Sequence, residues 1–406
     1  MRILLVVPGG AAPLDTGGGQ RSALFHRALR RLGELDVVLL QAKDGDWGTH
    51  PTFPGSRVID IGNDTLAPIA TTRVARAIQV VSKVLFVGRV IAPDERAASA
   101  FAQVLGEGRY DLIVFRFFPT LVTVFPALRE ARTSRLALDL DDRDDQKYRA
   151  AISARLGEGL VSRGLARWIS IQVGWMFQRY LKDVQLLWVV TPDDRLKSFE
   201  GVQRVAPNVA LSLPGAEKVV PAGEGRTVLF VGGAGHRPNV DGVRWFLTAC
   251  WPRIVARKPD AAFRLVGGGD WAGALGDAAR LPGVSLAGRV EDLGPEYSAA
   301  RLAVVPVPDG GGSKIKLVEA CAFSRPVVST AHGVRGFETT LGAGLRIHDD
   351  AAAFAEACLE LLLAPETASA EGAALGHLQR SHLSADGISQ MIAEDLGAIG
   401  FAGAAA

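Results

Sequence analysis

Short, continuous apolar runs recur along the chain, and many are separated by longer segments with apolar positions three or four residues apart. The runs are typical of strands buried on both faces of a parallel sheet, and the longer segments of amphipathic helices. We expect strands at 2–8, 35–40, 57–61, 112–116, 136–140 and 184–190, then at 227–231, 262–266, 284–286, 302–305 and 326–329. This alternation predicts an α/β fold with doubly wound parallel sheets.

The chain has 406 residues, which is too long for one typical hydrophobic core and indicates two domains. The clearest linker is the Pro/Gly-rich segment PGAEKVVPAGEGR, residues 214–226. We therefore predict a first Rossmann-like domain over 1–212 and a second over 213–383.

Glycine-bearing turns follow the predicted strands. The first, TGGGQR at 16–21, lacks the G-x-G-x-x-G spacing of dinucleotide sites, which leaves an anion or sugar-phosphate loop or a plain flexible turn. In the second half, such turns contain Gly232, Gly233 and Gly268, and a further turn contains Arg289 and Val290. Because parallel strands end at one edge of their sheet, these turns predict a nucleotide crevice there.

The most informative stretch is 308–337, PDGGGSKIKLVEACAFSRPVVSTAHGVRGF. Glycines at 310–312 allow close approach to the main chain, and we expect Ser313 to cap a helix over 314–323. A helix start with Lys314 and Lys316 is suited to an anion, and Glu319 is suited to sugar hydroxyls. The stretch predicts a nucleotide or nucleotide-sugar site; the alternative is an ordinary surface turn and a solvated helix.

A cluster of carboxylates follows the predicted strand 136–140. Its members are Asp139, Asp141, Asp142, Asp144 and Asp145. They lie at the carboxyl end of a parallel strand, where open α/β sheets bind ligands. Hydrogen bonds to a polyhydroxylated substrate, a Mg²⁺ site, and capping and solvation of the next helix are the three interpretations.

Two segments, 70–91 and 155–183, are basic and amphipathic, and the second is rich in aromatic residues. Helices of this composition can lie on an anionic bilayer. Alternatively, they pack on the sheet with a solvated basic face.

Composition narrows the classes further. Lys+Arg 45 and Asp+Glu 43 give a net charge of +2, which provides no argument for a nucleic-acid partner. The three cysteines lie in apolar helical contexts and are expected to be small core residues of a reduced compartment. The segment MRILLVVPGG is expected to be a first strand and not a signal peptide. The chain contains no run of 18 uncharged apolar residues, so we expect no membrane-spanning helix.

As a set, four motifs resemble a family-4 (group 1) glycosyltransferase of the GT-B class, in an exopolysaccharide-type branch. They are FVGGAGHRPNVDGVRWF at 230–246, LVGGG at 265–269, LAGRVEDL at 286–293 and GGGSKIKLVEACAFSRPVVSTAHGVRG at 310–336. The resemblance implies two Rossmann-like domains facing a cleft, with the acceptor on the first and the donor on the second. It also implies retention of configuration, no obligatory metal or other cofactor, and a C-terminal helix within 384–406 that returns to the first domain.

The resemblance also implies residue roles. Glu319 would bind the donor ribose, 310–314 the pyrophosphate and 288–290 the base, while Arg237 and glycines 17–19 would neutralise the leaving diphosphate. The candidate catalytic residues are Arg237, Lys314, Glu319, Asp139 and Asp142. The candidate donor-binding residues are Gly18, Gly19, Gly232, Gly233, His236, Asn239, Gly268, Arg289, Val290, Gly311, Gly312, Ser313 and Ile315.

Two of the departures from the family pattern lie in the donor motifs: Gly311 stands where a first glutamate is common, and Gly233 where an arginine is common. The leading hypothesis is transfer of a sugar from a nucleoside-diphosphate donor to a glycan or lipid-linked acceptor in polysaccharide assembly. The expected location is the cytoplasm. The segments 70–91 and 155–183 are the candidates for contact with the inner face of the cytoplasmic membrane. The two departures motivate an alternative, a non-catalytic glycosyltransferase-like binding subunit. A nicotinamide-dependent enzyme is disfavoured by the missing G-x-G-x-x-G.

Overall fold

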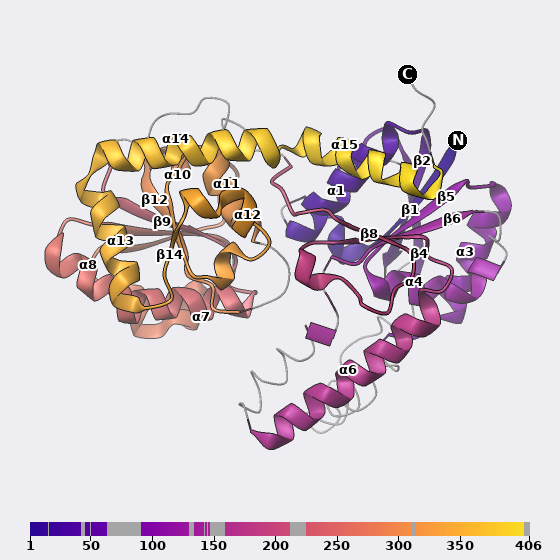
Figure 1. The fold of residues 1–406 in the computed structure, drawn as a ribbon, viewed down its shortest axis with the longest axis horizontal. Helices are drawn as coiled ribbons and strands as arrows, with labels where there is room; N and C mark the ends of the chain where they lie inside the picture. Colours follow the sequence, from indigo (N-terminus) through magenta and orange to yellow (C-terminus); the bar gives the residue numbers. More distant parts are fainter. Residues whose placement is uncertain are drawn as a thin grey trace. The chain divides into compact units, whose positions relative to one another are not determined.

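The computed structural model describes residues 1–14, 16–41, 45–48, 50–62, 91–129, 134–141, 143, 145–146, 159–211, 225–309 and 314–401. The chain divides into two compact units (Figure 1). Unit 1 comprises Met1–Ala206 and Ile388–Ala406, and unit 2 comprises Pro207–Gly387.

Unit 1 is built on an eight-stranded sheet in the order β3-β4-β2-β1-β5-β6-β7-β8, in which only the edge strand β3 is antiparallel to its neighbour. Its strands are β1 (Arg2–Pro8), β2 (Glu34–Gln41), β3 (Gly45–Gly48), β4 (Arg57–Gly62), β5 (Leu112–Arg116), β6 (Arg135–Asp139), β7 (Leu186–Val189) and β8 (Val202–Val205). The helices are α1 (Gly17–Arg30), α3 (Glu95–Glu107), α4 (Phe118–Val124), α6 (Leu160–Tyr180) and α15 (Ala385–Asp395), with short 3₁₀ turns at Gly9–Ala11, Phe125–Arg129, Pro192–Asp194 and Leu396–Ile399.

Helices cover both faces of this sheet (Figure 1). On one face, α3, α4 and the C-terminal half of α6 bury apolar side chains such as Phe101, Phe118 and Phe177. On the other face, the Trp188 ring packs edge-on against Phe25 of α1, and its indole N–H donates to Asp395 of α15 at 2.8 Å. Coverage of both faces explains why the strands consist of continuous apolar runs.

Unit 2 has a six-stranded, all-parallel sheet in the order β11-β10-β9-β12-β13-β14. Its strands are β9 (Thr227–Val231), β10 (Ala262–Val266), β11 (Val284–Gly288), β12 (Ala300–Val305), β13 (Val327–Ser329) and β14 (Arg346–Ile347). Its helices are α7 (Arg237–Trp245), α8 (Trp251–Arg257), α9 (Trp271–Leu275), α10 (Gly294–Ala299), α11 (Ile315–Ala322), α12 (Glu338–Leu341), α13 (Ala351–Leu363) and α14 (Pro365–His382), with 3₁₀ turns at Gly276–Arg280, His332–Val334 and Gly342–Gly344. In Figure 1, α7, α8 and α13 lie on one face of the sheet, and α10, α11 and α14 on the other.

Helices α7 and α8 are joined by a π-helical turn, Phe246–Cys250. Pro252 stands in the first turn of α8. Its ring has no N–H to donate and would collide with a carbonyl one turn earlier, so the wider π turn accommodates it without ending the helix. The π-helical turn thus joins α7 to α8 without an intervening loop.

The predicted class, two parallel α/β sheets, is confirmed. The sequence missed the edge strands β3, β8 and β14, which are short and carry little apolar pattern. Residues Pro192–Asp194 form only a short 3₁₀ turn, and the Thr191 hydroxyl before it donates to the Asp194 carboxylate. All three cysteines are free and buried, as expected.

The basic segment 70–91 lies almost wholly outside the described residues, whereas α6 falls within the second such segment, 155–183. Among the helices that the structure describes, none has both the length and the apolar character to cross a bilayer.

Candidate functional site

Glycines 17–19 form the first turn of α1 and not a loop before the helix. Thr16 is the N-cap, and its hydroxyl accepts the Gly19 N–H at 3.0 Å. A Cβ at Gly19 would lie 1.7 Å from the Pro13 carbonyl oxygen, so only glycine fits there. Gly18 contributes its carbonyl to the arginine cluster described next, and the helix start presents main-chain N–H groups at the carboxyl edge of the sheet.

A buried cluster of two arginines and two aspartates closes this edge of unit 1. Arg21 donates to both Asp139 oxygens, at 2.8 Å from Nε and 2.5 Å from Nη2, and to the Ala206 carbonyl at 2.7 Å. Arg116 also pairs with Asp139 and reaches Asp141 at 3.2 Å. Arg116 and Asp139 are fully buried.

Burial alone would raise the pKa of Asp139, but the charges and hydrogen bonds of Arg21 and Arg116 outweigh it and hold that pKa below its usual range. Both carboxylate oxygens are engaged by arginines inside the protein. Asp139 is thus the shared carboxylate of two buried ion pairs, and its predicted contact with substrate stays a prediction.

The rest of the acidic cluster has other roles. Asp145 pairs with Arg143 at 2.8 Å, and Asp141 has a positive φ of 55° beside the arginines. Asp142 and Asp144 lie outside the described residues. Among the described residues, no group of three or more His, Cys, Asp or Glu side chains could hold a metal ion.

The sequence offered no sign of Arg21 and Arg116 as functional or structural residues, because their partners are distant along the chain. The backbone next to them is unusual: Phe117 has φ 67°, and the Arg116 guanidinium lies 4.6 Å from its ring centroid. Strain of this kind at the end of a parallel strand is common at functional edges.

In unit 2 the glycine turns after β9, β10 and β11 lie side by side. The Gly232 N–H donates to the Val266 carbonyl at 2.8 Å, and the Ala234 N–H to the Gly268 carbonyl at 2.9 Å. The Gly267 N–H reaches the Gly288 carbonyl at 2.8 Å. The predicted sharing of one sheet edge by these turns is thus observed.

Lys316 of α11 joins this edge through two neutral partners. Its ammonium donates to the Asn239 side-chain oxygen at 2.5 Å and lies 5.2 Å from the centroid of the Phe230 ring. The Asn239 amide in turn donates to the Gly233 carbonyl at 2.9 Å. Asn239, a predicted donor ligand, therefore serves as a bridge between α11 and the turn after β9.

Desolvation, together with the charge of Lys314, lowers the pKa of Lys316 to about 7, against a smaller opposing effect of Glu319. Within the part of the chain that the structure describes, no carboxylate forms a salt bridge with this ammonium. A half-buried cation without an anionic partner, at the carboxyl edge of a nucleotide-type sheet, favours an anionic ligand.

Helix α11 begins at Ile315, so its N-cap is Lys314 and the predicted cap at Ser313 is wrong. Lys314 and Glu319 are buried, at 6% and 7% exposed. Burial, together with the charge of Glu319, raises the pKa of Tyr297, whose ring stacks on that of Phe323 with the centroids 4.7 Å apart. Gly311, Gly312 and Ser313 lie outside the described residues.

The remaining predicted donor residues lie in the turns. His236 is the N-cap residue of α7, and its pKa is lowered by desolvation and by the charge of Lys316. Arg237 is exposed and pairs with Asp241 at 3.1 Å. Arg289 and Val290 directly follow β11, next to the Gly268 turn. Their roles stay predictions.

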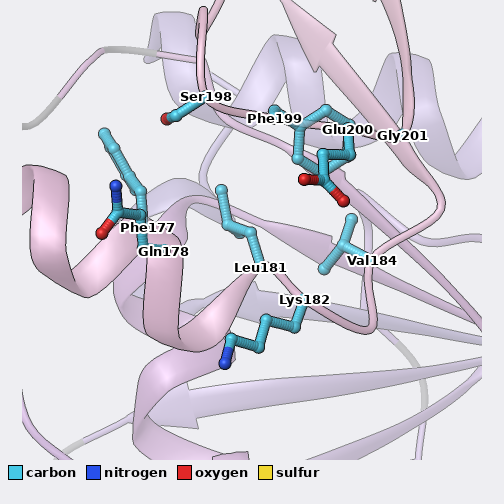
Figure 2. Close-up of a pocket in the computed structure, with 9 residues that line it drawn as sticks. All are labelled: Phe177, Gln178, Leu181, Lys182, Val184, Ser198, Phe199, Glu200 and Gly201. Carbon is cyan, nitrogen blue, oxygen red and sulfur yellow. The ribbon is translucent and has the colours of Figure 1, made fainter.

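A pocket of about 540 Å³ in unit 1 lies between the C-terminal end of α6 and the segment 198–201 (Figure 2). Both segments precede strands, β7 and β8 respectively, so the pocket is at the amino edge of the sheet. Ligands of open α/β sheets bind at the opposite edge, and none of the predicted site residues lines this pocket.

Comparison with known proteins agrees with this geometry. Residues 225–364 match the family model described as Glycosyl transferases group 1. No curated protein sequence matches the chain.

Solved structures resemble it over nearly its whole length. Sucrose-phosphate synthase from Thermosynechococcus elongatus is 19% identical with a TM-score of 0.69, covering 98% of this chain and 99% of its own. Anabaena HepE, in complex with UDP and glucose, is 15% identical with a TM-score of 0.61 and coverages of 98% and 99%. TarM is 10% identical with a TM-score of 0.64 and coverages of 97% and 98%.

The two parallel-sheet units thus have the GT-B fold of glycosyltransferases. Residues 225–364 match the model of the group 1 glycosyl transferases, which agrees with the resemblance seen in the sequence.

Proposed function

We propose that this group 1 glycosyltransferase moves a sugar, with retention of configuration, from a nucleoside-diphosphate donor to a glycan or lipid-linked acceptor in polysaccharide assembly. The observation that carries the proposal is the placement of Lys316 among the glycine turns of unit 2, within the family match. The UDP and glucose in the HepE structure favour a donor of this class.

Sugar transfer from a nucleoside-diphosphate donor requires positive charge near the leaving diphosphate. Cleavage of a glycosyl bond to a diphosphate leaves negative charge on the departing oxygen, and a preorganised cation with main-chain N–H groups stabilises it. Lys316 supplies the cation, and the start of α11 at Ile315 supplies N–H groups. Arg237 supplies a second, more exposed cation if it exchanges Asp241 for phosphate.

The other roles follow the family resemblance. Glu319 accepts hydrogen bonds from the ribose hydroxyls, and the main chain at 288–290 contacts the base. The diphosphate charge is met by lysine and arginine, without an obligatory metal. Unit 1 binds the acceptor, at the carboxyl edge that the Arg21–Asp139–Arg116 ion pairs hold rigid.

A panel of nucleoside diphosphates and their sugars tests the donor site by thermal shift, because a ligand that binds the native state raises the melting temperature. We expect at least one nucleoside diphosphate to stabilise the protein, and its sugar to be consumed with release of the diphosphate. Lys316→Met should remove both responses and leave the apoprotein folded.

The matched control is Lys258→Met, in the same unit but directly after α8, where the lysine pairs with exposed Asp260. This variant should behave like the wild type. Stabilisation by no nucleotide at millimolar concentration would contradict the donor site and favour the non-catalytic binding subunit. An unchanged response in Lys316→Met would contradict the role of that residue.

A further inference from the structure

Helix α6 has one face packed and one face exposed. Ile169, Val173, Phe177 and Tyr180, spaced three or four residues apart, are buried against unit 1. These residues run from the middle of the helix to its C-terminal end, and the N-terminal part of the helix extends away from the sheet (Figure 1). Burial of these four side chains therefore determines which face of α6 is exposed.

The exposed face of α6 is apolar. Among the described residues, five of the nine exposed large hydrophobic side chains lie on this one helix: Leu160 81%, Val161 72%, Trp168 41%, Ile171 39% and Trp175 60%. The two tryptophans are neighbours, with ring centroids 6.3 Å apart. Scattered apolar side chains on a surface are normal, but a contiguous set on one element marks an interaction surface.

The charge of the helix has one sign. Leu160–Tyr180 contains Arg163, Arg167 and Arg179 and no Asp or Glu, and Lys182 follows. At about 100° per residue, Ile171 and Trp175 lie near the centre of the exposed face, with Arg163 and Arg179 toward its two sides. The arginine and lysine side chains are exposed.

An anionic bilayer surface matches both properties. Tryptophan rings prefer the headgroup region of a bilayer, and each lysine or arginine near an anionic surface adds to binding. From Leu160 to Trp175 the apolar side chains extend along about 22 Å of helix, which suits shallow insertion parallel to the bilayer. The three arginines in the helix oppose insertion across it.

We propose that α6 is an interfacial helix that docks unit 1 onto anionic lipid through Trp168, Ile171 and Trp175, with Arg163 and Arg167 on the phosphates. The docking surface is independent of the transfer reaction, because it is made by α6 alone. It would bring the protein to a surface where a lipid-linked acceptor is presented.

Co-sedimentation of the full chain with vesicles tests the proposal without donor or acceptor. One set of vesicles is phosphatidylcholine alone, and the other is equal parts phosphatidylcholine and phosphatidylglycerol. We expect binding to the anionic vesicles, a blue shift of tryptophan emission, and weaker binding at high salt.

The variants separate the apolar and charged contributions. Trp168→Ser with Trp175→Ser should lower the vesicle partition coefficient about tenfold or more. Arg163→Gln with Arg167→Gln should lower it about fivefold for each arginine removed, and only on anionic vesicles. Leu363→Ser, which removes a 56% exposed side chain from α13 in unit 2, is the control and should bind like the wild type.

Because both tryptophans are substantially exposed, the double variant should keep the far-ultraviolet circular dichroism and melting temperature of the wild type. Absence of binding to either vesicle overturns the proposal, as does equal binding by the tryptophan variant. Reversible self-association that the tryptophan variant abolishes, without vesicle binding, would instead assign the face to a second copy of this chain and equally overturns it.

Discussion

The carboxyl edges of the two sheets differ in what their charged residues do. In unit 1, Arg21 and Arg116 are buried against Asp139 and Asp141, so the charges neutralise one another inside the protein. In unit 2, the Lys316 ammonium contacts the side-chain amide of Asn239 and the ring of Phe230. The same type of edge thus holds its charges in two ways: in unit 1 they pair with one another, and in unit 2 the cation lies among neutral partners.

The physical reason lies in the cost of desolvation. In a buried ion pair, the attraction between the two opposite charges offsets the cost of desolvation, and Asp139 accordingly has a lowered pKa. Neutral partners offset less of the desolvation cost of a cation, and the pKa of Lys316 is lowered to about 7. A residue held in such a state is suited to a ligand that supplies the missing charge.

The largest effect should come from breaking the unit 1 cluster. Asp139→Asn leaves Arg21 and Arg116 buried without their shared carboxylate and should lower the free energy of unfolding by about 3–5 kcal/mol. Urea denaturation measures it. Glu107→Gln, which breaks an exposed pair with Arg57, is the control and should cost less than about 1 kcal/mol. A similar small cost for both would show that the cluster is not structural.

The next largest effect should be on nucleotide binding in unit 2. Glu319→Gln replaces a buried carboxylate by an amide and should weaken binding of the preferred nucleoside diphosphate about ten- to hundredfold. Calorimetric titration gives the dissociation constant. Because hydrogen bonds to ribose should be lost, binding of inorganic pyrophosphate should change little; equal weakening of both ligands would indicate a general distortion of α11.

The smallest and most specific effect is on pH. A bound diphosphate stabilises protonated Lys316 and raises its pKa, so binding takes up a proton above the free-protein pKa of about 7. Affinity should therefore fall as pH rises above this value, by at most about tenfold per unit. Lys316→Arg stays charged throughout and should flatten the profile between about pH 7 and 9. An unchanged slope in this variant would assign the titration to another group.

Much of the fold could be predicted from the sequence because parallel strands covered on both faces leave continuous apolar runs, as in β1, β5 and β12. The edge strands β8 and β14 left no such signal, since their side chains are only partly buried. Glycine positions also carried information: a Cβ at Gly267 would lie 1.9 Å from the Gly232 carbonyl oxygen, a contact between two turns that both appear in the sequence pattern.

The acidic stretch after β6 shows where the sequence misleads. Its carboxylates indicated a substrate or a cation, yet Asp139 meets arginines that are 118 and 23 residues away along the chain. Local pattern contains no information about such a partner. The same limit applies to α6, whose sequence fitted both a packed helix and an interfacial one.

The sequence by itself determined the α/β class, the family resemblance and the stretch around Glu319, because periodicity, glycine spacing and motif order are local properties of the chain. Only the tertiary structure decided which charges are neutralised and which are available. Ion pairing, desolvation and exposure depend on side chains brought together from distant segments, as with Asp139 between two arginines and Lys316 between Asn239 and Phe230.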